Sequence, residues 1–257
     1  MSARQKQAVT NSDEPPNWLQ RLVVHWEAVS ATVITFNYDL FVELAWLISL
    51  GDDRRFRRSL YLYPVPITPI GSRLGYPVGG VPTTDGLRLL KLHGSLSWRY
   101  SGQGSTPGDV IYDMGVLGSG WDVDGIGPRN FGNGRPDADE LSVDREPMIV
   151  PPAAVKSSYY NNRTLQKLWQ SAADALSRAE ELVIMGFSLP QTDLLVSSML
   201  ATTLRDDRVI TPVDYGTKIL DRVAETFDLK GFEGARINSS FAGLKDDALS
   251  AWVESIA

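Results

Sequence analysis

Short apolar runs alternate with stretches of helical spacing along most of the chain. Residues 31–36, ATVITF, are apolar and β-branched, which is typical of a buried strand, and apolar positions recur at helical spacing through residues 39–50. The same alternation returns in the second half of the chain. We expect strands at residues 31–36, 87–92, 148–150, 182–187, 208–213 and 235–238. We expect helices at residues 18–29, 39–50, 162–179, 192–204 and 216–227, with one more at the C-terminal end.

This alternation predicts an α/β fold. Strands that are apolar along their whole length are buried on both faces, so the pattern indicates a mostly parallel sheet covered by helices on each side. Ligands of such sheets bind beyond the carboxyl ends of the strands. The candidates for a site are therefore the residues that follow the expected strands, namely Asn37, His93, Ser188 and Asp214.

Two stretches interrupt the alternation. Residues 52–86 are rich in Pro, Gly and Arg, and residues 100–146 contain many Gly and Asp and few apolar residues. We expect neither stretch to build much core. We interpret the chain, residues 1–257, as a single domain with loop-rich insertions, and residues 100–146 as an insertion or lid that is mobile over the strand ends.

The composition narrows the classes of function. A formal net charge of −6 argues against nucleic acid as a partner, because non-specific binding to phosphates needs an excess of Lys and Arg. With no cysteine and two histidines, the chain has no disulfide and no cysteine-ligated zinc, and we expect no bound metal. The N-terminal residues lack the apolar core of a secretory signal, and no apolar run reaches the ~20 residues of a membrane-spanning helix. We expect a soluble, cytoplasmic protein without a membrane partner.

The segment TFNYD at residues 35–39 joins an expected strand to an expected helix. Asn37 would emerge at the strand end, and Asp39 would begin the helix. Two interpretations stay open, because Asp and Asn favour caps and turns as readily as they serve ligand binding. The first is a helix cap at Asp39 with Asn37 in the turn, and the second is a ligand site.

The segment KLHGS at residues 91–95 ends another expected strand. His93 would accept a proton near neutral pH, and Gly94 would permit the close approach of a ligand. The alternative is a partly buried histidine bonded to a neighbouring carbonyl group. The other histidine, His25, lies in an amphipathic helical stretch, and we interpret it as structural.

A third candidate follows the strand expected at residues 182–187. Gly186 and Ser188 lie at its end, and Asp193 would begin a helix whose amide groups face a phosphate or a ribose. The segment superficially resembles the nucleophile elbow of a hydrolase. That motif needs Gly where Pro190 stands, and no histidine follows Ser188, so the sequence disfavours a serine hydrolase.

Four segments in this order resemble the sirtuin-like domains of bacteria: TFNYD at 35–39, KLHGS at 91–95, IVPP at 149–152 and LVIMGFSLPQTD at 182–193. The resemblance covers about residues 30–225, and four ordered motifs are more specific than any one of them. It implies a Rossmann-like three-layer fold that binds NAD as substrate and cleaves the bond between nicotinamide and ribose. Many bacterial members are NAD hydrolases that serve anti-phage defence.

The resemblance also implies a role for each matched residue. Asn37 would position water or ribose, Asp39 would hold the nicotinamide amide, and His93 would act as the base. Gly186 and Ser188 would line the path of the ribose and phosphates. We add Gly94 and Asp214, which directly follow strand ends, to the residues expected to bind the cofactor.

One family feature is missing: nothing before Thr32 matches the Gly-Ala-Gly loop that cradles the pyrophosphate. Three explanations stay open, namely an N-terminally shortened chain, a strand supplied by a second copy or another subunit, and weakened NAD binding. Without cysteines there is no zinc module of the deacylating sirtuins, which favours hydrolysis over deacylation. The first hypothesis is an NAD hydrolase, and the alternative is a non-catalytic nucleotide-sensing or protein-interaction module.

Overall fold

The structure is a computed structural model of the 257-residue chain. It describes residues 14–49, 59–75, 85–115, 136–151, 161–190, 193–205, 207–227, 236–244 and 248–256. The chain divides into two compact units. Unit 1 comprises Met1–Pro151 and Lys156–Trp169, and unit 2 comprises Pro152–Val155 and Gln170–Ala257. Each unit is described by itself.

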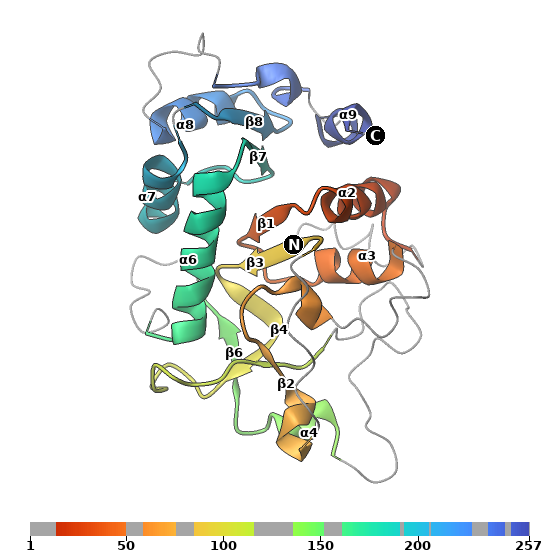
Figure 1. Cartoon of the computed structure of the whole chain (residues 1–257), viewed down its shortest axis with the longest axis vertical. Helices are drawn as coiled ribbons and strands as arrows, with labels where there is room; N and C mark the ends of the chain where they lie inside the picture. The colour runs from red at the N-terminus through yellow and green to blue at the C-terminus, as the bar shows by residue number, and fades with distance from the viewer. Residues whose placement is uncertain are drawn as a thin grey trace. The chain divides into compact units, whose positions relative to one another are not determined.

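Unit 1 begins with a strand–helix–strand crossover (Figure 1). Strand β1 (Thr32–Thr35) pairs in parallel with β3 (Arg88–Lys91), and helices α2 (Asn17–Ala28) and α3 (Phe41–Ser49) pack against each other. Parallel strands need a long crossover, and α3 lies within the one between β1 and β3. Leu22 and Val23 of α2, Leu44 and Trp46 of α3, and the two leucines of β3 are buried in the core of this part, whereas β1, expected as a buried strand, is half-buried along its length.

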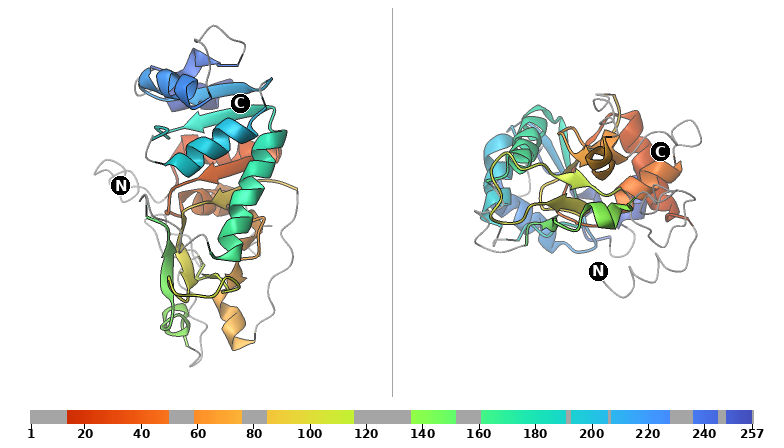
Figure 2. Two further views of the ribbon diagram at one scale, coloured as in Figure 1. Left: turned by 90° about the vertical axis from the view of Figure 1, so that its left-hand side faces the viewer. Right: turned by 90° about the horizontal axis from the view of Figure 1, so that it is seen from below.

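A four-stranded sheet completes unit 1. Its order is β2 (Thr68–Pro69), β5 (Tyr112–Asp113), β4 (Gly94–Tyr100) and β6 (Glu146–Ile149). Strand β2 is parallel to β5, whereas β4 is antiparallel to both β5 and β6. Two short 3-10 helices, η2 (Ser59–Leu62) and η3 (Ile70–Leu74), and helix α4 (Ala138–Leu141) accompany the sheet. Figures 1 and 2 show η3 and α4 together beyond one end of it.

The two irregular stretches contribute more core than the sequence predicts. Leu62 and Tyr63, from residues 52–86, are fully buried, as are Ile111 and Met114 from residues 100–146. The expectation of little core is therefore wrong for the described parts of both stretches. The reason is that their few apolar residues cluster in short runs beside β2 and β5, and the Tyr63 ring packs on the Trp98 ring of β4, with centroids 5.1 Å apart.

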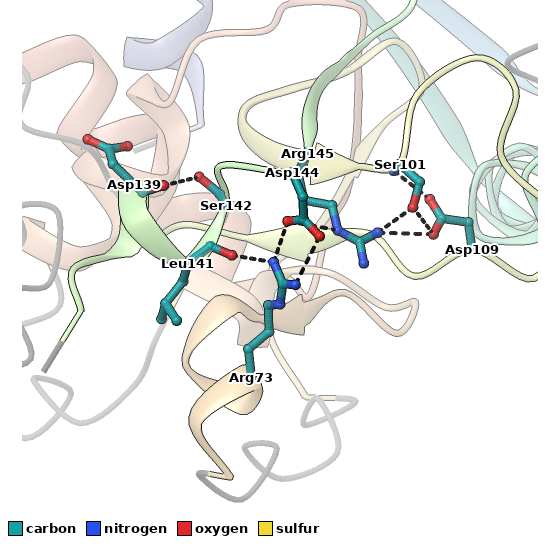
Figure 3. A network of polar contacts seen from close by, with 8 residues as sticks. All are labelled: Arg73, Ser101, Asp109, Asp139, Leu141, Ser142, Asp144 and Arg145. Carbon is teal, nitrogen blue, oxygen red and sulfur yellow. Dashed lines mark hydrogen bonds and ion pairs between the residues drawn. The ribbon is translucent and has the colours of Figure 1, made fainter.

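A network of arginine contacts ties these parts of unit 1 together (Figure 3). Arg73 of η3 donates two hydrogen bonds to Asp144, at 2.5 and 3.0 Å, and Arg145 pairs with Asp109 at 3.1 Å. Both guanidinium groups lie over the ring of Tyr112, at 5.9 and 5.0 Å from its centroid. The hydrogen bond from Arg73 lowers the pKa of the Asp144 carboxyl. The described ends of residues 100–146 are thus attached to the sheet, while residues 116–135 lie outside the described residues.

Unit 2 repeats the crossover. Strands β7 (Glu181–Met185) and β8 (Val209–Val213) are parallel, with Glu181 opposite Val209, and α7 (Leu194–Thr203) connects them. Helix α6 (Arg163–Arg178) precedes β7; its residues up to Trp169 belong to unit 1 and those from Gln170 on to unit 2. Helix α8 (Lys218–Thr226), η4 (Ser239–Phe241) and α9 (Ala248–Ser255) follow β8. The strand expected at residues 235–238 is reduced to an isolated parallel bridge between Ile210 and Ile237.

The predicted Rossmann-like α/β class is confirmed, since both units contain a strand–helix–strand crossover with parallel strands. The antiparallel strands around β4 are an addition that the sequence did not predict. None of the helices in the described part of the chain is long and apolar enough to cross a membrane.

Candidate functional site

The pairing of β1 and β3 sets the geometry of the candidate site. Thr35 lies opposite Lys91, and the ladder continues with a hydrogen bond of 3.1 Å from the Leu92 amide to the Thr35 carbonyl. Asn37 and His93 each follow the last paired residue by two positions. Because the strands are parallel, both residues leave the sheet at the same edge. Unit 1 therefore brings Asn37 and His93 together as the strand-end argument predicts.

His93 is more enclosed than a residue facing an open cleft. It is 5% exposed, and its ring lies 5.1 Å from the ring of Phe36, tilted by 57°. Its carbonyl accepts a hydrogen bond of 2.9 Å from the Val150 amide, which joins the β3–β4 turn to the end of β6. The imidazole therefore contributes packing to unit 1 as well as a titratable group at the strand ends.

The loop after β1 is anchored on several sides. The Asn37 amide donates to Thr35 Oγ1 at 3.1 Å, and the Tyr38 carbonyl accepts from the Leu96 amide at 2.9 Å. The Tyr38 hydroxyl donates to the Val150 carbonyl at 2.8 Å, although 112 positions separate the two residues. Asn37 itself is exposed. The loop thus presents the Asn37 side chain to solvent from a fixed backbone.

Asp39 uses one carboxylate oxygen locally. Its Oδ1 accepts a hydrogen bond of 3.2 Å from the Phe41 amide, at the first turn of α3. This contact supports the capping interpretation of Asp39. A carboxylate accepts more than one hydrogen bond, so the cap leaves capacity for a ligand amide.

Gly94 has a structural reason to be glycine. Its φ is +86°, and a Cβ placed on it would overlap the carbonyl oxygen of Met148 and lie 2.9 Å from the carbonyl carbon. Strands β4 and β6 approach each other closely at this point. The backbone packing explains the glycine without a ligand, and its place among cofactor-binding residues stays a prediction.

A buried polar cluster lies behind the strand ends, and the sequence analysis missed it. Lys91 and Glu43 are each 1% exposed and form an ion pair of 2.9 Å. The Tyr63 hydroxyl donates to the same Glu43 oxygen at 2.8 Å. Glu43 is the single charge within the segment FVELAWLIS, and Lys91 follows two leucines in RLLK. A charge beside such apolar positions is the signal that would have identified them.

Burial shifts the acid–base behaviour of this cluster. Burial, followed by the nearby Glu43 carboxylate, raises the pKa of the Tyr63 hydroxyl well above its ordinary value. Burial also raises the pKa of Asp113 from 3.8 to about 6, although hydrogen bonds from Ser97 and from the Gly115 backbone act in the opposite direction. The interior of unit 1 therefore holds a carboxyl group that titrates in the mildly acidic range.

The remaining predicted residues belong to unit 2. Gly186 follows β7 with a φ of +58°, and nothing lies within 4 Å of the position of an added Cβ. Ser188 is exposed. Asp214 follows β8, and its Oδ1 accepts a hydrogen bond of 2.8 Å from the Gly216 amide, which closes a turn. Open backbone at Gly186 fits a ligand path, whereas the Asp214 side chain has a local role.

No group of three or more metal-ligating side chains occurs within the described ranges. In unit 1 the predicted residues offer an amide and a carboxylate after β1 and an imidazole after β3. In unit 2 they offer open backbone after β7.

Comparison with known proteins assigns no family to this chain. No protein-family model matches the chain, and no curated protein matches it. This chain is similar to a solved structure described as "Structural Basis for the Mechanism and Regulation of Sir2 Enzymes". The similarity covers 94% of this chain and 70% of the other chain, with 16% sequence identity and a TM-score of 0.43. The fold and site define the class of protein on their own: an α/β protein with polar residues at the ends of parallel strands.

Proposed function

We propose that this chain is a sirtuin-like NAD hydrolase that cleaves the bond between nicotinamide and ribose. The observation that carries the proposal is the parallel register of β1 and β3, which brings Asn37 and His93 to one sheet edge. The four ordered sequence motifs that resemble bacterial sirtuin-like domains support it. The exposed Asn37 on its anchored loop supports it as well.

The chemistry needs orientation more than a strong nucleophile. Cleavage breaks the bond between the ribose C1′ and the nicotinamide nitrogen, and the bonding electrons leave with nicotinamide through an oxocarbenium-like state. Water adds to C1′ and loses a proton, which gives ADP-ribose. In our proposal Asn37 orients water or ribose, Asp39 holds the nicotinamide amide and His93 takes the proton.

The alternative is a non-catalytic nucleotide-sensing or protein-interaction module. The burial of His93 and the cap made by Asp39 favour it, because they give both residues a structural role that does not require catalysis. This module would bind NAD without turnover, or bind a protein partner instead. A second copy of the chain, or another subunit, that completes the sheet fits either candidate.

The test is nicotinamide release from NAD by the wild type and two pairs of variants. His93→Gln keeps a polar side chain in the buried position, and we expect it to lower kcat by about a hundred- to ten-thousand-fold, as for loss of a general base. His25→Gln is the matched control at the other histidine, and it should keep full turnover. Asn37→Ala should lose turnover, while Asn17→Ala at the start of α2 should not.

Thermal unfolding of every variant separates chemistry from stability. If His93→Gln is folded and turns NAD over like the wild type, His93 is not the base and the proposal is wrong. If the wild type binds NAD without cleaving it, the sensing module takes its place. A role in anti-phage defence belongs to the same proposal, and it predicts fewer plaques on cells that express the wild type than on cells that express His93→Gln.

A further inference from the structure

A lysine ammonium is buried directly behind the proposed site. Lys91 is the last residue of β3, and its side chain is 2% exposed. Its Nζ donates to Glu43 Oε1 at 2.9 Å and also to the main-chain carbonyl of Asp39. Tyr63 donates to the same oxygen of Glu43 at 2.8 Å, so the carboxylate is held from two sides.

Stability alone gives little reason for this arrangement. Buried ion pairs lose hydration on folding, and apolar residues of similar volume are often as stabilising or more so. Two leucines precede Lys91 in β3, RLLK, and Glu43 is the single charge in α3, FVELAWLIS. The use of buried charges that is best supported is to specify one geometry among several.

The geometry specified here is that of the loop after β1. The Asp39 carbonyl lies in that loop, two positions beyond Asn37. Other hydrogen bonds also hold the loop: Tyr38 contacts Leu96 and Val150, the Asn37 amide contacts Thr35, and the Asp39 carboxylate accepts from the Phe41 amide. A hydrogen bond from an ammonium is stronger than a neutral one, so the Lys91 contact is a strong restraint on this backbone.

We propose that Lys91, held by Glu43, is a positioning residue that fixes the Asp39 carbonyl and thereby the orientation of Asn37 toward the substrate. This inference rests on the proposed function, because it assigns Lys91 to the same site. The effect of Lys91 on the loop does not depend on turnover: without the ammonium, the backbone around Asn37 and Asp39 becomes more mobile.

The variants separate positioning from folding. Lys91→Met removes the ammonium but leaves Glu43 buried without its counter-charge, so it can lose stability for that reason alone. The double variant Lys91→Met/Glu43→Leu removes both charges and keeps the volume apolar, and it should stay folded. Lys167→Met, at an exposed position on α6, is the matched control for the loss of a lysine.

The absence of cysteine in the chain permits a finer comparison. Lys91→Cys can be alkylated in denaturant and refolded, with either an aminoethyl or a propyl group on sulfur. The first product is a close analogue of lysine, and the second differs from it by a methyl group in place of the ammonium. Any difference between them reports on the charge.

Two readouts are measured on each protein. The first is amide hydrogen exchange of residues 37–41, compared with exchange in β1 and α3. The second is the kinetics of nicotinamide release. We expect the folded double variant and the propyl form to exchange these amides at least about tenfold faster, and to lose about ten- to a hundred-fold in kcat with little change in KM. The aminoethyl form should recover both properties.

The outcomes distinguish the two proposals. Unchanged exchange of residues 37–41 in the folded double variant, or equal behaviour of the aminoethyl and propyl forms, overturns the positioning role. A wild type without turnover overturns the proposed function, while the exchange measurement still decides the effect of Lys91 on the loop. Loss of kcat without any change in exchange also contradicts positioning.

Discussion

The buried carboxyl of Asp113 gives unit 1 a specific dependence on pH. Its pKa is raised from 3.8 to about 6, chiefly by burial. An acid whose pKa is raised on folding binds its proton more tightly in the folded state, so it stabilises the fold below about pH 4. This stability is lost as the pH rises through the folded pKa of about 6. A shift of about two units at 1.4 kcal/mol per unit corresponds to about 3 kcal/mol of unfolding free energy.

The perturbation is Asp113→Asn, which keeps the shape of the side chain and removes its titration. The unfolding free energies of wild type and variant are measured by urea denaturation at pH 4, 5, 6 and 7. We expect the unfolding free energy of the variant, relative to that of the wild type, to increase by about 3 kcal/mol between pH 4 and pH 7. Comparing the two proteins at each pH cancels the contributions of all other groups.

Asp144→Asn is the matched control, because its pKa shift has the opposite sign. The hydrogen bond from Arg73 lowers the pKa of Asp144, so its contribution is present above its unfolded pKa and is lost as the pH falls. Between pH 4 and pH 7 the difference in unfolding free energy between wild type and the Asp144 variant should therefore stay nearly constant, and it should shrink only below the ordinary pKa of 3.8. A difference between wild type and Asp113→Asn that stays constant from pH 4 to pH 7 would refute the burial argument.

Three further predictions concern structure and composition. Gly94→Ala should be destabilising by several kcal/mol, because its Cβ would overlap the Met148 carbonyl. Gly186→Ala has open space around it and should cost only about 1 kcal/mol. Equal urea midpoints for the two variants would contradict this. Arg73→Gln should destabilise the chain by about 1 kcal/mol or less, because the side chains of Arg73 and Asp144 are 30% and 51% exposed. Salt at about 1 M should reduce this effect. A decrease in unfolding temperature that salt does not change would contradict the prediction. Elemental analysis of the purified chain should find no stoichiometric zinc, and one zinc per chain would show that the metal prediction is wrong.

Local signals predict those elements whose caps and periodicity agree. Helix α6 is expected from residue 162, and the structure shows why: the Asn162 side chain accepts hydrogen bonds from the amides of Thr164 and Leu165, at 2.9 and 3.3 Å. Strand β1 follows from its β-branched run, and the common edge of Asn37 and His93 follows from the geometry of parallel strands. These parts of the fold depend on neighbours in sequence or on one general rule.

The parts of the fold that the sequence did not predict depend on contacts between residues distant in the sequence. Strand β4 begins with Gly94 and Ser95, which the sequence analysis interprets as the end of a strand, and its pairing with β6 brings together residues about fifty positions apart. The contacts of Lys91 with Glu43 and Asp39 likewise join β3 to α3 and to the loop after β1. Such contacts cannot be found from local periodicity, although a single charge in an apolar segment, as at Glu43, indicates where to look.

The most direct measurement of the proposed NAD chemistry is a proton NMR time course of NAD incubated with the wild-type chain. The account predicts that the nicotinamide signals of NAD are replaced, one for one, by those of free nicotinamide, while ADP-ribose accumulates in equal amount. An NAD spectrum that stays unchanged in the presence of the folded chain would contradict it.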